Sequence, residues 1–256
     1  MRFLFSLLIV FFSFNSCTSQ KKDSAENNYD TSTSVKKNAS PQTGKIVSNI
    51  VCESDKRFSY SIYLPASYQD KKIYPAVIFF DPHAKADIPL EKYRNLADKF
   101  GYILLASCDS KNGLSPGIYP EIYAALKNEL TEKYRVRKNR IYCAGFSGGA
   151  RVAINIGLSD KSIAGVIANS AGFEPSRSPI TNDFVFAGVA GNEDFNLLEQ
   201  KRTEKSLSEF SIPHLFTEFD GKHEWASELS MERIFIFFES ISTRKEKSSE
   251  NDSIVF

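Results

Sequence analysis

A serine between closely spaced glycines lies where a short apolar segment ends and a helical pattern begins. Residues 141–144 are apolar over a length typical of a strand, and apolar residues recur at helical spacing over 150–156. Between them is Gly145-Phe146-Ser147-Gly148-Gly149. A Gly-x-Ser-x-Gly pattern between strand and helix is typical of a nucleophile elbow, a strained turn that exposes a serine hydroxyl above a sheet edge. The sequence therefore predicts that Ser147 is a nucleophile.

A serine hydroxyl needs a base to remove its proton, and a histidine base needs an acid to fix its tautomer. The chain contains three histidines, His83, His214 and His223. In elbow hydrolases the acid and then the histidine follow the serine, on loops after later strands. His223 comes just after a predicted strand and just before a predicted helix, so we expect it at the same sheet edge as Ser147. His214 begins that strand, so we expect it at the opposite end as a structural or exposed residue.

The acid is expected on the loop that follows the predicted strand 184–190. Asp194 and Glu193 are both candidates there, and Asp194 is favoured. Asp220 is a weaker candidate because it stands only three residues before His223. Asp194 also has the position of a helix N-cap, and the two roles are compatible.

The oxyanion formed by attack on a carbonyl needs hydrogen-bond donors already in place. The N–H of Gly148 directly follows the nucleophile at the start of a predicted helix, whose dipole favours negative charge there. A second donor is expected after the strand that ends at Phe80, at Pro82, His83 or Ala84. Pro82 has no N–H, so the backbone of His83 is the better candidate.

Strands that are apolar on both faces alternate with helices along the chain, which predicts a mainly parallel sheet covered on both sides. One α/β domain is expected over residues 44–242. The expected strands cover residues 58–64, 74–80, 102–106, 141–144, 163–168, 184–190 and 215–219, and the expected helices cover 88–100, 118–130, 195–210 and 225–241, besides the one after Ser147.

Both ends of the chain differ in composition from this domain. Residues 1–16 combine an early arginine with an apolar run of signal-peptide length, and Ser16-Cys17 resembles a bacterial lipoprotein box. This predicts an exported protein anchored to a membrane of the bacterial envelope by lipid on Cys17, the outer membrane in a Gram-negative host. An ordinary cleaved signal with an incidental cysteine is the alternative. Residues 17–43 are polar and predict a flexible tether, and residues 243–256 predict a disordered tail.

Charge and cysteine content restrict the partners. The formal net charge of the 256-residue chain is +1, which argues against nucleic acid as the main partner. No metal-ligand cluster or nucleotide-binding loop is visible, so neither a metal nor a cofactor is implied. Besides Cys17, Cys143 is expected in the core. Cys52 and Cys108 could form a disulfide in an oxidising compartment, but spacing alone does not show that they meet.

Four segments together are similar to the α/β-hydrolase superfamily, and within it to compact extracellular esterases related to polyhydroxybutyrate depolymerase and feruloyl esterase. The segments are Tyr63-Leu64-Pro65 with Tyr68, residues 140–150, residues 191–194 and residues 220–225. The resemblance implies a three-layer α/β-hydrolase fold and a catalytic triad of Ser147, Asp194 and His223. Fewer than twenty residues separate the predicted strands 163–168 and 184–190, so no sizeable cap domain is expected. One departure is Asp81-Pro82-His83-Ala84, where that family usually has His-Gly. A loop without glycine is stiffer, which counts against a backbone N–H of this loop as the second oxyanion donor.

These observations predict a serine esterase that hydrolyses carboxylic esters, such as carbohydrate-linked or aryl esters, through an acyl-enzyme. Phe146, Trp225 and Tyr119 are candidates for an apolar substrate pocket, and equally for the core. One alternative is a peptidase of the prolyl-oligopeptidase type, whose nucleophile turn also reads Gly-x-Ser-x-Gly-Gly but which usually carries a gating domain. Another is a non-catalytic envelope binding protein on a hydrolase scaffold, which the altered loop at Asp81 favours.

Overall fold

The structure is a computed structural model that describes residues 42–174 and 185–254, with side chains as far as Glu246. The predicted signal peptide, Cys17 and all of the predicted tether except its last two residues lie outside the described residues. Within the described ranges, no helix is both long and apolar enough to cross a bilayer.

The described strands form one eight-stranded sheet in the order β1-β2-β4-β3-β5-β6-β7-β8. The strands are β1 (Ile46–Val51), β2 (Ser59–Tyr63), β3 (Tyr74–Phe80), β4 (Ile103–Ser107), β5 (Val136–Phe146), β6 (Ile163–Asn169), β7 (Val185–Gly191) and β8 (His214–Phe219). β1 pairs antiparallel with β2, and β2 with β4, whereas all other neighbours are parallel. The predicted mainly parallel sheet is confirmed.

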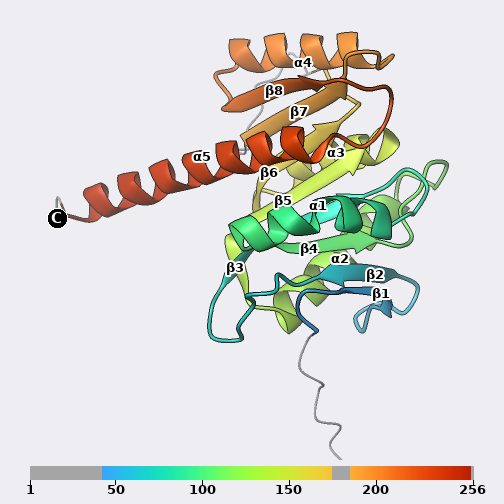
Figure 1. Cartoon of the computed structure of the whole chain (residues 1–256), viewed down its shortest axis with the longest axis vertical. Helices are drawn as coiled ribbons and strands as arrows, with labels where there is room; N and C mark the ends of the chain where they lie inside the picture. The colour runs from blue at the N-terminus through green and yellow to red at the C-terminus, as the bar shows by residue number, and fades with distance from the viewer. Residues whose placement is uncertain (1–41, 175–184, 255–256) are drawn as a thin grey trace, which may run out of the picture. The chain divides into compact units, whose positions relative to one another are not determined.

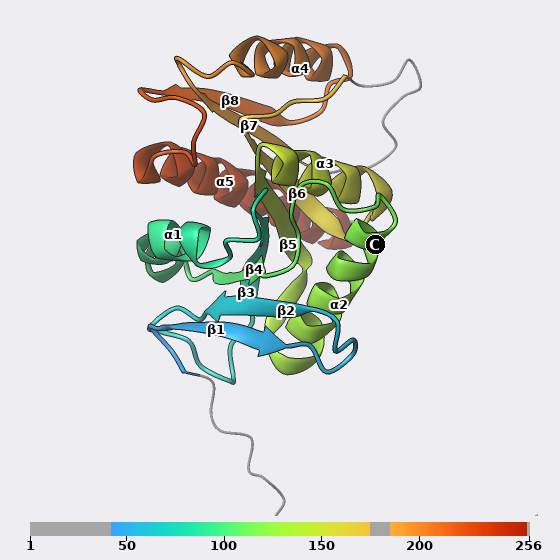
Figure 2. The same ribbon diagram turned by 90° about the vertical axis from the view of Figure 1, so that its right-hand side faces the viewer.

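Helices cover both faces of this sheet, as Figures 1 and 2 show. The buried apolar side chains form two cores. The helices are α1 (Asp87–Phe100), α2 (Ile118–Lys133), α3 (Gly148–Ser159), α4 (Leu197–Glu209) and α5 (Glu228–Ile254). α2 and α3 pack on one face, and α1 and α5 pack on the other. Every residue of β3, β4 and β7 is buried. Burial on both faces explains why these strands have no polar alternation.

The predicted strands and helices are present, but β1 was not expected from the sequence. Its six residues read Ile-Val-Ser-Asn-Ile-Val, and Asn49 has a φ of 56°. The register with β2 shifts between Val47 and Ile50. Such a bulge breaks the period of two by which a strand is recognised in a sequence.

The C-terminal segment also differs from expectation, because α5 continues to Ile254 through residues predicted to be disordered. Its first half is an apolar stripe that packs on the sheet, with Met231, Phe235 and Phe238 buried. A helix started by such packing extends at little cost, since each further residue adds one hydrogen bond. The ion pair between Arg137 and Glu246, 2.6 Å long, links the extension to β5.

The described cysteines are all free. Cys143 is fully buried within β5, and this burial raises the pKa of its thiol well above the usual value. The expectation that Cys143 is a core residue is confirmed. Cys52 and Cys108 form no disulfide in this structure.

Candidate active site

Ser147 occupies a sharp turn between β5 and α3 in a conformation rare for residues other than glycine, with φ 54° and ψ −117°. Such backbone strain costs on the order of 1–3 kcal/mol and is concentrated at functional sites. The flanking glycines make the turn possible. A Cβ on Gly145 would lie 2.1 Å from the Gly149 carbonyl oxygen, and one on Gly149 would lie 2.0 Å from the Phe80 carbonyl oxygen. A side chain at Gly145 would push the start of α3 away from β5, and one at Gly149 would push it away from the end of β3.

Three residues from different loops form a hydrogen-bonded series at this turn. Ser147 Oγ lies 2.9 Å from His223 Nε2, and His223 Nδ1 lies 3.0 Å from Asp194 Oδ1. An ionised carboxylate only accepts hydrogen bonds, so Nδ1 carries the proton and Nε2 is left to accept the serine hydroxyl proton. The structure thus brings together the three residues expected from their order in the chain.

The two other acidic candidates do not contact the histidine. Glu193 is exposed, and Asp220 Oδ1 instead accepts a hydrogen bond of 3.2 Å from Asn192 Nδ2. The side chain of Asp194 is completely buried. Its Oδ1 also accepts the Asn196 N–H at 2.7 Å, and its Oδ2 has no partner in the described part of the chain. Of the three acidic candidates, Asp194 is the one with a hydrogen bond to His223 and a buried side chain.

The loops that carry Asp194 and His223 approach each other closely. Glu193 N donates to the Gly221 carbonyl oxygen at 3.0 Å. A Cβ on Gly191 would lie 2.3 Å from that same oxygen. The glycine at position 191 is therefore required by packing between the two loops.

Asn169, at the end of β6, was not predicted and links the nucleophile to the histidine loop. Its carbonyl oxygen accepts the Ser147 N–H at 2.8 Å. Its fully buried side chain accepts the Ala226 N–H at 2.6 Å and donates to the Glu224 carbonyl oxygen at 3.1 Å. In the sequence, Asn169 is an amide residue at the end of an apolar strand. A residue with a purely structural role often has the same position, so the pattern did not mark Asn169 as part of the site.

Aromatic rings surround His223. Phe195, also not predicted, stacks on the imidazole with centroids 4.0 Å apart and is 75% exposed. Phe146 also contacts the imidazole, with the ring centroids 4.8 Å apart and the rings tilted by 44°. Phe146 and Trp225 are both buried, so they support the site from the core, and the exposed ring available to a substrate is Phe195.

The expected oxyanion donors differ in their availability. Gly148 is the first residue of α3, so its N–H has no acceptor within the helix. The His83 N–H, by contrast, donates to Asp81 Oδ1 at 2.8 Å. The Ala84 N–H donates to the Asp81 carbonyl oxygen at 3.2 Å. The expectation for His83 does not hold in this structure, because the Asp81 carboxylate forms a local turn that captures its N–H.

Several solved structures resemble this chain in overall fold. Esterase B from Lactobacillus rhamnosis, in a phosphonate-inhibited form, aligns with a TM-score of 0.63 at 15% identity, over 81% of this chain and 89% of that one. The S-formylglutathione hydrolase FrmB from Staphylococcus aureus aligns with a TM-score of 0.62 at 13% identity, over 77% and 98%. A feruloyl esterase module from Clostridium thermocellum, complexed with sinapinate, aligns with a TM-score of 0.57 at 15% identity, over 76% and 87%.

The chain has the α/β-hydrolase fold. No protein-family model and no curated protein matches its sequence. At these identities the structural likeness establishes the fold only. The α/β-hydrolase fold expected from the sequence motifs is therefore confirmed.

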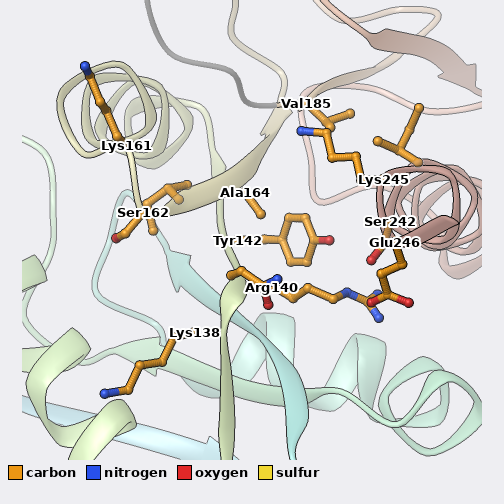
Figure 3. A pocket seen from close by; sticks show the side chains of 13 residues that line it. Lys138, Arg140, Tyr142, Lys161, Ser162, Ala164, Val185, Ser242, Lys245 and Glu246 are labelled. Atoms are coloured by element: carbon orange, nitrogen blue, oxygen red, sulfur yellow. The ribbon is translucent and has the colours of Figure 1, made fainter. Parts of the chain in front are cut away.

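Two cavities lie beside the sheet. A groove of about 460 Å³ lies between α2 and α3 and includes Gly148 and Tyr119 in its wall. Tyr119 is thus the one predicted substrate-binding residue that lines a cavity next to the nucleophile. The second cavity, of about 540 Å³, lies where β5, β6 and β7 begin, and Figure 3 shows Arg140 of β5 extending toward Glu246 of α5 there. Ser147 stands at the other end of β5, so this second cavity is separate from the site.

Asp160 closes the far end of the groove between α2 and α3. Its Oδ2 accepts hydrogen bonds of 2.7 Å from both Tyr123 Oη and Lys127 Nζ, and its Oδ1 accepts the Ser162 N–H at 2.8 Å. Partial burial raises the pKa of Asp160, but these hydrogen bonds outweigh it and hold the pKa below its usual value. Asp160 is therefore an ionised and fully partnered group.

Proposed function

We propose that this protein is a serine hydrolase that cleaves carboxylic esters through an acyl-enzyme. The observation that carries the proposal is the series from Ser147 Oγ to His223 Nε2 at 2.9 Å and from His223 Nδ1 to Asp194 at 3.0 Å, built on a strained turn. These are the distances over which a serine proton can be transferred to a base.

The reaction follows from this geometry. Ser147 Oγ attacks the ester carbonyl carbon while its proton moves to His223 Nε2, and the resulting imidazolium is stabilised by the buried Asp194 carboxylate. The Gly148 N–H, at the start of α3, donates to the oxyanion. The tetrahedral intermediate collapses as His223 returns the proton to the leaving alkoxide, giving a free alcohol. Water, deprotonated by the same histidine, then releases the acid and restores the serine.

The state of the oxyanion loop favours esters over amides. Because the His83 N–H already donates to Asp81, the Gly148 N–H is the expected backbone donor that remains for the oxyanion. Removing one donor from such a site typically costs about 10²–10³-fold in kcat. An alkoxide leaves a tetrahedral intermediate more easily than an amine anion, so an ester tolerates this loss better. The same contact is the observation that favours the second candidate, a binding protein on a hydrolase scaffold.

Labelling with a fluorophosphonate tests the proposal, because the probe reacts with an activated serine. We expect one adduct on Ser147 of the wild type, detected by mass spectrometry, and none in Ser147→Ala or His223→Ala. His214→Ala is the matched control, since His214 lies at the start of β8 with its ring nitrogens near Ile212 O and Ser208 Oγ. An unlabelled, folded wild type would favour the binding protein. Faster turnover of aminoacyl anilides than of p-nitrophenyl acetate would favour a peptidase.

We also infer that the chain is exported and anchored through lipid on Cys17. The apolar run of residues 3–12 and the small residue before Cys17 support this. Metabolic labelling with an alkyne-bearing palmitate in a bacterial host should mark the wild type and leave Cys17→Ala unmarked. Label retained by Cys17→Ala would contradict the assignment.

A further inference from the structure

The groove between α2 and α3 is built from one face of each helix. From α3 it is lined by Gly148, Val152, Asn155, Ile156 and Ser159, which recur at spacings of three and four. From α2 and the turn before it come Pro116, Tyr119, Pro120 and Tyr123, with the same periodicity. Residues with this spacing share a helix face, so the two rows run along the groove as its walls.

The groove starts at the residue that follows Ser147 and is long. One end is formed by Gly148, whose N–H follows the nucleophile directly, and the opposite end by Ser159. Eleven residues separate these two positions, which corresponds to about 16 Å along a helix axis. An aryl acid would occupy only the first part of such a groove, whereas an extended aliphatic chain would follow all of it.

The charged groups of the groove are already paired. Arg151 forms two hydrogen bonds with Glu199, of 2.7 and 2.9 Å. At the far end Asp160 is held by Tyr123 and Lys127, as described above. The remaining wall is mainly proline, tyrosine and aliphatic side chains. A groove with no unpaired charge favours a neutral, apolar occupant, because a charged one would lose its hydration without a partner.

The position of the groove in the sheet assigns it to the acyl side of the substrate. β7 and β8, which precede Asp194 and His223, lie on one side of β5, and β4, which leads into α2, lies on the other. His223 must stand next to the leaving oxygen to return its proton, so the alcohol is expected on the His223 side, near the exposed Phe195. The opposite side, where the groove opens beside Gly148, is left for the acyl chain.

We propose that the groove binds the acyl chain of the substrate, and that the substrates are esters of linear aliphatic acids of medium to long chain. This rests on the proposed ester hydrolysis at Ser147 and specifies its substrate class. Asn112 stands at the entrance: its Oδ1 would lie 1.8 Å from a Cβ placed on Gly148, so its amide lies directly over that residue. The chain must pass this amide to enter the groove.

The test uses p-nitrophenyl esters from acetyl through butyryl and octanoyl to dodecanoyl, with p-nitrophenyl cinnamate as the aryl comparison. For the wild type, kcat/KM should rise with chain length, by up to about fourfold for each methylene that enters the groove. Asn155→Trp places a ring about 10 Å from Gly148 along α3 and Ser159→Trp places one about 16 Å away. Both are exposed helix positions. The ratio of dodecanoyl to acetyl kcat/KM should fall most in Asn155→Trp and less in Ser159→Trp.

Asn128→Trp is the matched control, because it makes the same substitution at an exposed position of α2 outside the groove, and its ratio should equal that of the wild type. A wild type that hydrolyses the acetyl ester but gains nothing from longer chains would overturn the proposal while leaving ester hydrolysis standing. So would cinnamate turnover above that of every linear ester, or an Asn155→Trp ratio like that of the control. A wild type inert toward all of these esters would refute the proposed function, and the groove assignment with it.

Discussion

Asp194→Asn is the substitution for which the structure gives the most definite expectation. The carboxylate is completely buried, and the change preserves its volume. If the amide oxygen stays where Oδ1 is, it keeps the Asn196 N–H but no longer offers His223 a negative charge. A unit charge about 4 Å from an imidazolium contributes about 4 kcal/mol at an effective dielectric constant of 20, or about 10³-fold in rate. If the amide turns its NH₂ to His223, it fixes the wrong tautomer, which costs about 10⁴-fold.

We therefore expect kcat for p-nitrophenyl acetate to fall by about 10³–10⁴-fold in Asp194→Asn, with thermal unfolding showing that the protein remains folded. Glu193→Gln and Asp220→Asn are the matched controls, since both neutralise exposed carboxylates of the same two loops. Each should retain activity within about twofold of the wild type, as is usual for changes at exposed positions. A folded Asp194→Asn within tenfold of wild-type kcat would refute the assigned role, as would an equal loss in Glu193→Gln.

Three further outcomes follow from contacts around the site. Phe195→Ala should lower kcat/KM by about 2- to 10-fold, because it removes the ring stacked on His223. The melting temperature should stay unchanged. An unaltered kcat/KM would show that Phe195 takes no part in the reaction. Asn169→Ala should lower the free energy of unfolding by about 1–3 kcal/mol for each of the two backbone groups left unpaired. Urea unfolding measures this loss. An unfolding midpoint equal to that of the wild type would contradict the bridging role of Asn169. Asp160→Asn should be destabilised near neutral pH by about 1–3 kcal/mol. Because the folded pKa of Asp160 lies below the unfolded value of about 3.9, its contribution is full above that value and is lost as the pH falls. The difference between Asp160→Asn and the wild type should therefore shrink under acid, and a constant difference would refute this.

The parts of the fold and site that the sequence predicted are those with a local cause. The elbow could be recognised because the glycines around Ser147 are required within one turn, and a strand and a helix flank it. The parallel sheet could be recognised because strands buried on both faces are apolar throughout. His223 was placed by its position after a strand and before a helix. None of these inferences needed a distance between residues far apart in the chain.

The parts that were missed depend on such distances. The Asn169 side chain forms hydrogen bonds with backbone groups more than fifty residues away, and a local sequence pattern does not predict such contacts. Phe195 resembled the first apolar residue of a helix, although it is 75% exposed and lies on His223. The capture of the His83 N–H depends on where the Asp81 carboxylate points, so the motif alone could not exclude it as a donor. The ordered end of α5 depends on packing of the helix half that precedes it.

Asp81 fixes the loop after β3, whose residues 81–84 contain no glycine. Its buried carboxylate accepts the Trp225 indole N–H through Oδ2 at 2.9 Å and the His83 N–H through Oδ1 at 2.8 Å. Trp225 is two residues from His223, so one carboxylate ties the oxyanion-side loop to the segment that carries the base. A site fixed in this way needs little reorganisation during the reaction, which is the condition under which hydrogen bonds and dipoles lower a barrier most. The same link withdraws one backbone donor from the oxyanion. For the proposed ester hydrolysis, a rigid site with one backbone donor fewer suits esters whose alcohol leaves easily. Under the same proposal, the groove beside Gly148 would determine which acyl chain is accepted.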